Sequence, residues 1–237
     1  MADAVFIRDL WKFFGGRAVL AGIDLRVHEG EVFGLIGPNG AGKTTCFRIV
    51  ATVLKPSRGE VRVFGHDVVA DPMSVRKIIS YLPEEAGVYR NLTGLDFLNL
   101  TSKLYGGVDN ERIREGMELS GLGDRMRDRL GTYSKGMRRR LLLARSLMIH
   151  PRLAILDEPT VGLDVEHAVY VRNIIKEYAR KGTTFLISSH NMLEVEYLCT
   201  RVAFIDRGRI IEEGEPWKLL DEYGVENLEE LFVKVRG

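Results

Sequence analysis

Short apolar runs separated by glycine-containing turns make up the first part of the chain. The runs are Val5–Ile7, Val19–Leu20, Ile23–Val27 and Val32–Ile36, with turns at Gly15-Gly16 and Glu29-Gly30. Runs of this length and spacing predict β-strands. After Gly42 the pattern changes, because apolar residues at positions 46, 47, 49 and 50 suit a short buried helix. The predicted order is therefore strand, glycine loop, helix.

The rest of the chain alternates between strands and helices. Strands are predicted over residues 59–64 and 78–82, and a helical insertion is predicted from about residue 95 to residue 123. Apolar runs at 153–156 and 184–187 flank a helical pattern over 165–180, which is typical of a βαβ unit in a parallel sheet. A hairpin from strands 202–205 and 209–213, and an amphipathic helix from Trp217 onward, complete an α/β fold.

Composition narrows the classes of function. The chain has 237 residues, with 34 Lys and Arg against 33 Asp and Glu, so its net charge of +1 argues against nucleic acid as a partner. Two distant cysteines, Cys46 and Cys199, are expected to be buried thiols of a reducing compartment. No apolar run approaches a membrane span, and no secretory signal pattern opens the sequence. We therefore expect a cytoplasmic, non-integral chain.

Residues 37–44 fit the pattern G-x-x-x-x-G-K-[ST] of a phosphate-binding loop. Its glycines let the backbone present several N–H groups to a phosphate at a helix N-terminus. The expected nucleotide-binding residues are Gly37, Pro38, Asn39, Gly40, Ala41, Gly42, Lys43, Thr44 and Thr45. Lys43 is expected to contact the β- and γ-phosphates, and the hydroxyl of Thr44 to ligate Mg²⁺.

A dinucleotide-binding alternative fails on the spacing of the glycines. Gly34, Gly37 and Gly40 do not form G-x-G-x-x-G, and no acid follows a strand about twenty residues later. ATP with Mg²⁺ is therefore the expected ligand of this loop.

Two acids, Asp157 and Glu158, end the apolar run at 153–156. Ligands of open α/β sheets gather at the carboxyl ends of strands, so Asp157 is expected to ligate Mg²⁺ and Glu158 to act as general base. The alternative for such a pair is a solvated loop start. His190 ends the next apolar strand, and we expect it beside the same sheet edge, near the γ-phosphate or the attacking water.

Taken together, these motifs resemble the ATP-binding subunits of ABC transporters over nearly the full chain. Tyr133–Met137 resembles the signature sequence of that family, and Val161–Asp164 matches its D-loop. His190 matches the switch histidine. Phe14 matches the aromatic residue that stacks on adenine, although Phe13 and Phe14 would also suit a hydrophobic core.

The resemblance implies a fold and a mechanism. The fold is a single cassette: a P-loop NTPase core with a parallel sheet and an N-terminal antiparallel β subdomain (about residues 1–85 and 151–237), and a helical subdomain carrying the signature (about residues 86–150). Two copies pair head to tail, so Ser134 and the backbone N–H of Gly136 bind the γ-phosphate of the partner's ATP. Glu158, His190 and Lys43 carry hydrolysis, which drives separate transmembrane permease subunits. The implied location is the cytoplasmic face of the cell membrane.

Three features depart from the family pattern or carry no assigned role. Glu84 stands where the family has the glutamine of its Q-loop, and its carboxylate is still suited to hold Mg²⁺ or the attacking water. Lys135 replaces the first signature glycine, which places a cation beside the partner's nucleotide or in solvent. For the run Arg138–Arg140 we expect solvated charge rather than a basic binding patch.

The direction of transport and the class of ATPase are inferred from two short stretches and from the number of cassettes. The stretch 227–233 and the stretch Tyr81–Glu85 resemble subunits of drug, lipid and polysaccharide exporters, which favours export. The alternative function is a soluble ABC-type ATPase that remodels a protein or nucleic-acid complex. Such proteins often carry two cassettes or a long coiled coil, and this sequence has one cassette and no heptad run.

Overall fold

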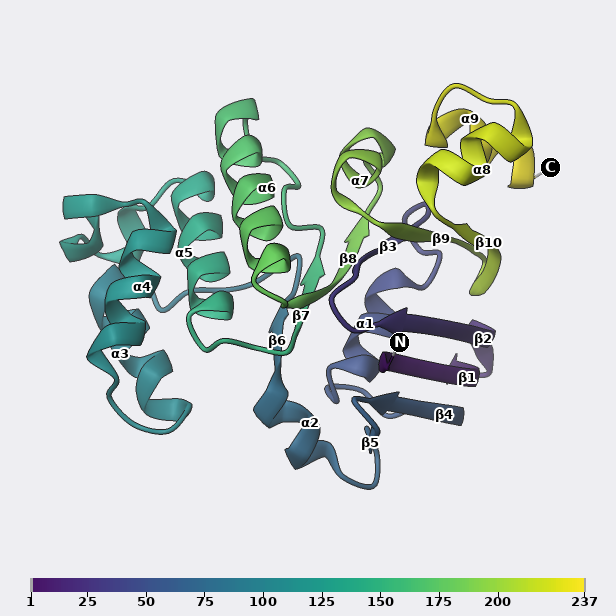
Figure 1. Cartoon of the computed structure of the whole chain (residues 1–237). Coiled ribbons are helices and arrows are strands. Elements are labelled where there is room, and N and C mark those ends of the chain that lie inside the picture. Colours follow the sequence, from purple (N-terminus) through teal and green to yellow (C-terminus); the bar gives the residue numbers. More distant parts are fainter. Residues whose placement is uncertain (1, 237) are drawn as a thin grey trace.

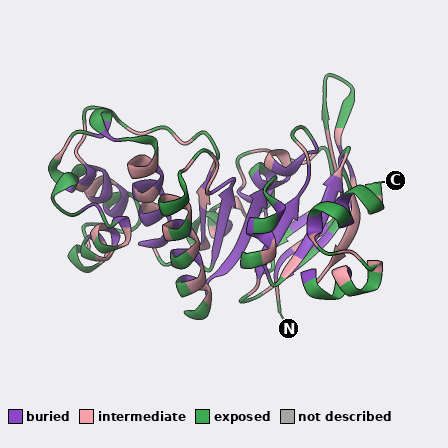
Figure 2. Ribbon diagram, turned by 90° about the horizontal axis from the view of Figure 1, so that it is seen from above, coloured by how far each residue is buried: buried purple, intermediate pink, exposed green. Residues whose placement is uncertain are grey.

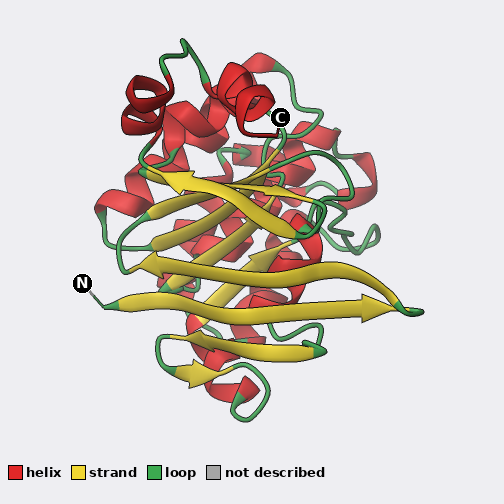
Figure 3. Ribbon diagram, turned by 90° about the vertical axis from the view of Figure 1, so that its right-hand side faces the viewer, coloured by secondary structure: helices red, strands yellow, loops and turns green. Residues whose placement is uncertain are grey.

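Two β-sheets form the centre of the computed structural model, which describes residues 2–236. The smaller sheet is antiparallel, in the order β2-β1-β4-β5, and its two long strands run across the lower half of Figure 3. Its strands are β1 Asp3–Phe14, β2 Arg17–His28, β4 Arg58–Val63 and β5 His66–Asp67. This antiparallel arrangement of the N-terminal strands agrees with the sequence-based prediction.

The larger sheet has the order β10-β9-β3-β8-β7-β6. Its strands are β3 Val32–Ile36, β6 Ile79–Leu82, β7 Leu153–Asp157, β8 Thr184–Ser189, β9 Arg201–Asp206 and β10 Arg209–Gly214. The first five of these pair in parallel, and β10 pairs antiparallel with β9. Every residue of β3, β7 and β8 is buried, as expected of central parallel strands covered on both faces.

Helices cover both faces of the larger sheet. They are α1 Lys43–Val50, α2 Pro72–Ile78, α3 Gly94–Leu104, α4 Asn110–Ser120, α5 Lys135–Leu147, α6 Val165–Arg180, α7 Met192–Leu198, α8 Pro216–Tyr223 and α9 Leu228–Arg236, with 3₁₀ turns η1 Gly123–Arg127 and η2 Leu130–Thr132. Helices α3, α4 and α5 gather at one end of the molecule, on the left of Figure 1. This end carries the predicted signature sequence at the start of α5.

The hydrophobic core is divided between the two faces of the larger sheet. Along β3, Val32 and Ile36 belong to the cluster under α3 to α9, whereas Phe33 and Leu35 face α1 and the antiparallel sheet. This alternation follows from the two-residue period of side chains along a strand. Figure 2 shows the result, with buried strands in the middle and exposed helix surfaces outside.

Most predicted elements are confirmed, with differences at their bounds. The runs at 19–20 and 23–27 belong to one strand, β2, and the C-terminal segment forms two helices separated around Gly224. Helix α2, capped by Asp71, was not predicted. Cys46 and Cys199 are free and buried, as expected. Within residues 2–236, no helix combines the length and the apolar character needed to cross a bilayer.

Candidate nucleotide site

The phosphate-binding loop joins β3 to α1 and depends on glycine at two positions. Gly42 caps α1 with φ of 116°, a region that disfavours other residues. A Cβ atom on Gly37 would lie 2.1 Å from the carbonyl oxygen of Ile205 on β9. The loop can therefore pass close to the neighbouring strand only because no side chain is present there.

Lys43 begins α1, and its ammonium group is directed back into the loop. Its Nζ donates to the carbonyl oxygen of Gly37 at 2.6 Å and to that of Pro38 at 3.4 Å. The same Nζ lies 3.6 Å from Oε1 of Glu158, and both side chains are about 7% exposed. The parallel sheet thus brings the β3–α1 loop against the end of β7, as the sequence predicted.

Asp157 and Glu158 are held by Ser188 on the adjacent strand. Asp157 pairs with Ser188 across β7 and β8, and the Ser188 hydroxyl donates to Oδ1 of Asp157. The same hydroxyl accepts the backbone N–H of Glu158 at 3.0 Å. Sequence reasoning gave Ser188 no role, although its place at the end of an apolar strand beside Asp157 would have pointed to it. The solvated-loop alternative for the two acids is wrong, because both are buried.

Glu158 has an unusual backbone conformation with φ of 50°. Residues other than glycine adopt this left-handed region at a cost of order 1–3 kcal/mol, and they persist there only where the surrounding structure holds them. Here the backbone N–H bonds to Ser188 provide that support. The strain aims the Glu158 carboxylate between the phosphate-binding loop and His190.

His190 lies directly against Glu158. Its Nδ1 is 2.9 Å from Oε2 of Glu158, and its backbone N–H donates to the same oxygen at 3.4 Å. The imidazole is half exposed, so its other edge faces outward from the carboxylate. The predicted position of His190 at the sheet edge is therefore confirmed, and its immediate partner is the carboxylate of Glu158.

A cavity beside the phosphate-binding loop brings the predicted residues together. Its lining includes Pro38, Asn39, Gly40, Gly42, Lys43, Thr44, Thr45, Glu84 and Glu158, together with Val19 from β2. We call it the P-loop cavity. Glu84 reaches it from the loop after β6, a region far from the other residues in sequence. The sequence-based placement of Glu84 beside the phosphate loop is thus confirmed, while its role stays a prediction.

The donors around the P-loop cavity suit a divalent cation. Among residues 2–236, Oδ2 of Asp157 and Oε1 of Glu158 are buried oxygens that accept no hydrogen bond. Thr44 and Glu84 add a hydroxyl and a carboxylate to the lining. Hard oxygen ligands of this kind are those that Mg²⁺ prefers, so the residues present fit the metal.

The signature residues lie outside the P-loop cavity of their own chain. Ser134 is the N-cap of α5, and its hydroxyl accepts the backbone N–H of Met137 at 3.2 Å. Gly136 packs against the ring of His167 on α6, where a Cβ atom would lie 2.6 Å from that ring. Lys135 extends over the D-loop, because a Cβ on Gly162 would be 2.0 Å from its Nζ.

Asp164, the D-loop residue singled out by the sequence, is the N-cap of α6. Its carboxylate accepts the backbone N–H of His167 at 2.9 Å and lies 2.7 Å from Nδ1 of the same residue. These hydrogen bonds, the backbone one first, lower the pKa of Asp164 below its ordinary value. Asp164 therefore begins α6 as a charged residue.

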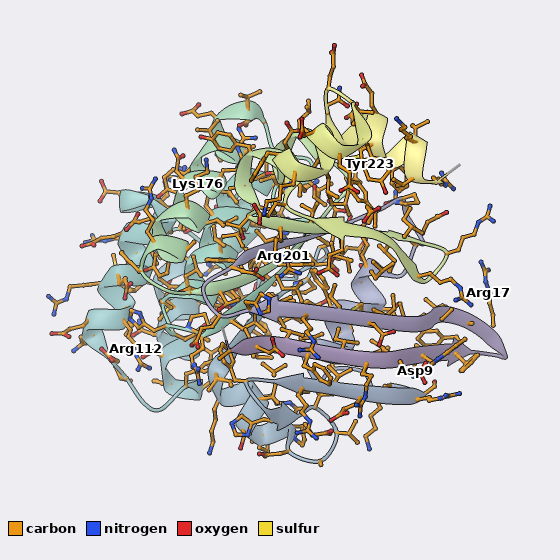
Figure 4. The ribbon with its side chains drawn as sticks, turned by 45° about the vertical axis from the view of Figure 1, so that its right-hand side comes forward. Asp9, Arg17, Arg112, Lys176, Arg201 and Tyr223 are labelled. Carbon is orange, nitrogen blue, oxygen red and sulfur yellow. The ribbon has the colours of Figure 1, made fainter. Side chains whose placement is uncertain are left out.

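Phe14 is a predicted site residue that does not line the P-loop cavity. It pairs with Arg17 at the tip of the β1–β2 hairpin, which projects from the body of the molecule in Figure 4. Its ring is half exposed, and Nζ of Lys12 is 5.1 Å from the ring centroid. Phe13 is also exposed, so the alternative that these are core aromatics is wrong.

Arg139 contradicts the expectation of solvated charge for the run 138–140. It is 7% exposed and donates to five backbone carbonyl groups, those of Pro83, Glu84, Asp157, Glu158 and Pro159. Burial lowers its pKa to about 10, an effect that nearby acids oppose. Arg140 is also engaged, because it donates to the carbonyls of Ser120 and Gly121 and stacks on Tyr170. The directions in which successive helix residues point did not reveal these acceptors, because the acceptors come from distant loops.

Comparisons with known proteins agree with this geometry. A family model described as ABC transporter matches residues 20–161. The daunorubicin/doxorubicin resistance ATP-binding protein DrrA of Streptomyces peucetius is 43% identical over 93% of this chain and 68% of its own length. The linearmycin resistance ATP-binding protein LnrL of Bacillus subtilis is 34% identical over 94% of this chain and 72% of its own.

A solved structure of an ATP-binding subunit of an ABC transporter superposes on nearly the whole chain. It is 27% identical, covers 99% of this chain and 100% of its own, and gives a TM-score of 0.90. The chain belongs to the ATP-binding subunits of ABC transporters and is an ATPase of that family.

Proposed function

We propose that this chain hydrolyses Mg·ATP to power export through separate transmembrane permease subunits. The observation that supports this most directly is the position of Glu158, whose two oxygens lie 3.6 Å from Nζ of Lys43 and 2.9 Å from Nδ1 of His190. A carboxylate held between a cation and an imidazole at the edge of a phosphate-binding cavity suits activation of water. The backbone strain at Glu158 is consistent with this catalytic role.

In the proposed reaction the chain's own residues position water and bind charge. Glu158 accepts the proton of the attacking water while His190 holds the orientation of the carboxylate. Lys43 and the backbone N–H groups of the loop bind the phosphates, in place of the carbonyl and carboxylate contacts that Lys43 makes here. Mg²⁺, held by Thr44, Asp157 and Glu84, would neutralise charge on the phosphate oxygens.

The proposed assembly is a head-to-tail homodimer that forms with ATP. Ser134 and Gly136 do not line their own P-loop cavity, and they lie at the N-terminus of α5, where peptide dipoles favour an anion. This arrangement suits the γ-phosphate of an ATP bound by the partner. Phe14, exposed at the end of β1, would stack on the adenine of the chain's own ATP.

Export is favoured by the relatives, two of which are named for resistance to a drug. We place the chain on the cytoplasmic face of the cell membrane, held there by permease subunits, with no nucleic acid as partner. The group of α3, α4 and α5, about residues 86–150, would act as the helical subdomain that carries the signature.

The experiment is an affinity pull-down from detergent-solubilised membranes of the source cells, with the Glu158→Gln variant used to prolong ATP-dependent contacts. We expect a multi-spanning membrane protein to be retained with ATP. The matched control is the Lys43→Ala variant, which should not show the ATP-dependent gain. Recovery of soluble proteins or ribonucleoprotein alone would contradict the transport function and favour a remodelling ATPase.

A further inference from the structure

Every guanidinium donor of Arg139 is used by a backbone carbonyl. Nε donates to Pro159 at 2.8 Å, and Nη2 donates to Asp157 at 2.8 Å and Glu158 at 2.7 Å. Nη1 donates to Pro83 at 3.0 Å and Glu84 at 3.3 Å. A guanidinium has five N–H groups in a rigid planar fork, so this set exhausts them.

The five acceptors belong to two loops that carry chemistry. The carbonyls of residues 83 and 84 follow β6, whereas that of residue 157 ends β7 and those of residues 158 and 159 follow it. The side chains of Glu84 and Glu158 line the P-loop cavity, while the guanidinium of Arg139 donates to their backbone carbonyl groups. One buried side chain therefore sets the distance between the proposed Q-loop carboxylate and the proposed general base.

Arg139 also lies close to the signature along α5. It follows the N-cap Ser134 by five residues, which is about one and a half helical turns. A second cavity is lined by Lys135, Arg138 and Arg139 together with Glu84 and the D-loop residue Val161. Glu84 thus borders both this cavity and the P-loop cavity, so the two sites share a wall.

A fold that needed only packing at this position would not require a charge. A buried ionic group is often no more stabilising than a well-packed apolar one of similar volume, and among residues 2–236 no carboxylate is bonded to this cation. Its donors instead fix the direction of five carbonyl groups. The arrangement therefore suits the transmission of a small displacement of α5 into the two loops.

We propose that Arg139 is a positioning residue that couples occupation of the signature by the partner's ATP to the placement of Glu84 and Glu158 in its own chain. The proposal rests on the head-to-tail dimer of the proposed function. Engagement of Ser134 and Gly136 shifts α5, and Arg139 carries that shift to the carbonyls of the catalytic loops. Hydrolysis at one site then depends on the ATP held at the other, which is a coupling between two sites.

The test is a double-mutant cycle on the turnover number of ATP hydrolysis. Arg139→Lys keeps the charge but has at most three donors, and we expect kcat to fall at least tenfold while the Kd for Mg·ATP stays within threefold. Ser134→Ala lowers kcat by disengaging the signature. If Arg139 transmits that engagement, the kcat of the double variant should lie within threefold of the kcat of the slower single variant.

The control is Lys181→Gln, at an exposed lysine that pairs with Glu177 and lies in neither cavity. We expect it to leave kcat nearly unchanged and to combine multiplicatively with Ser134→Ala. The proposal is overturned if Arg139→Lys and Ser134→Ala also combine multiplicatively, or if Arg139→Lys has the parental kcat. It is equally overturned if Arg139→Lys weakens Mg·ATP binding as much as it slows turnover, because that indicates only a damaged fold.

Failure of the dimer mechanism is detected separately. The Glu158→Gln variant and the Glu158→Gln, Arg139→Lys double variant are run on a sizing column with Mg·ATP, and both are expected to dimerise. A monomeric Glu158→Gln chain would overturn the dimer mechanism itself. If both of these variants dimerise but the effects of Arg139→Lys and Ser134→Ala on kcat multiply, only the role of Arg139 is overturned.

Discussion

Nζ of Lys43 and Oε1 of Glu158 lie 3.6 Å apart, in a pair of side chains that are nearly inaccessible to solvent. The two residues are distant in sequence and come from the ends of different strands, β3 and β7. The cation stands where phosphate charge is expected, and the carboxylate stands where water is to be activated. Substitution of either residue separates these two roles.

Replacement of Glu158 by glutamine should stop hydrolysis and keep binding. The amide retains the shape of the side chain but cannot take a proton, and general base catalysis is worth on the order of 10²–10⁴ in rate. We expect kcat to fall at least about 100-fold, with an ATP-dependent dimer accumulating on a sizing column. Unchanged hydrolysis would remove Glu158 from the role of general base.

Replacement of Lys43 by alanine should weaken nucleotide binding. The variant loses a charge-assisted hydrogen bond to phosphate, worth roughly 1.5–3 kcal/mol, which is about a 10- to 100-fold change in Kd. Equilibrium titration with a fluorescent ATP analogue measures this. Lys181→Ala, which removes an exposed lysine paired with Glu177, is the control and should bind as the parent does. Equal affinity in the Lys43 variant would contradict the loop assignment.

Changes at Ser134 should block dimerisation without unfolding the chain. Ser134→Arg introduces bulk and loses the N-cap of α5, which costs about 1 kcal/mol, or roughly 2–4 °C in Tm for a chain of this size. Ser134→Asp keeps a good N-cap but places a negative charge against the partner's γ-phosphate. Both variants, made in the Glu158→Gln background, should stay monomeric with ATP. A dimer in either case would show that the signature is assigned wrongly.

Glu194 on α7 should give the chain a pH-dependent stability. Its carboxylate is buried and accepts a hydrogen bond from Thr160, and desolvation is the main cause that raises its pKa above the ordinary value of 4.5. Because the folded state binds this proton more readily than the unfolded state, stability falls as pH rises from 4.5 through the raised pKa. Above that pH range the loss of stability caused by the ionised Glu194 is constant.

The Glu194→Gln variant tests the direction of this pH dependence of stability. The amide can still accept the Thr160 hydroxyl and carries no charge, so we expect greater stability at pH 8 by the order of 1 kcal/mol, roughly 2–4 °C in Tm. The difference between variant and parent should shrink as the pH is lowered towards 4.5. Thermal unfolding followed by circular dichroism across this range measures it. A difference that grows on acidification would contradict the stated direction.

The sequence alone predicted most of the local structure of the site. The spacing of glycines around Lys43 and the apolar strand before Asp157 predicted the phosphate-binding loop and the pair of acids at the end of that strand, because such patterns depend on residues close in the chain. His190 was placed correctly, since the carboxyl ends of parallel strands meet at one edge of the sheet. The short helix α2 was missed because its apolar pattern spans barely two turns.

Long-range contacts were beyond the sequence. The helical periodicity of α5 indicates on which side of the helix Arg139 lies, but it does not show which groups accept its hydrogen bonds. The arginine run was therefore interpreted as solvated charge. Folding instead places the loops after β6 and β7 around its guanidinium, and these loops lie about 55 and 20 residues away in the chain. Lys135 remains exposed, and its Nζ lies close to Gly162 of the predicted D-loop.

The sequence by itself therefore determined which segments form strands, which loop binds phosphate and which acids end β7, because backbone propensity and side-chain period are local properties. Only the tertiary structure decided that Glu158 lies between Lys43 and His190, that Ser188 supports both acids, and that Arg139 joins two catalytic loops. These relationships depend on the order and register of the parallel strands, in which residues remote in sequence pair side by side. Burial then excludes water, so each polar group must find its partner within the protein.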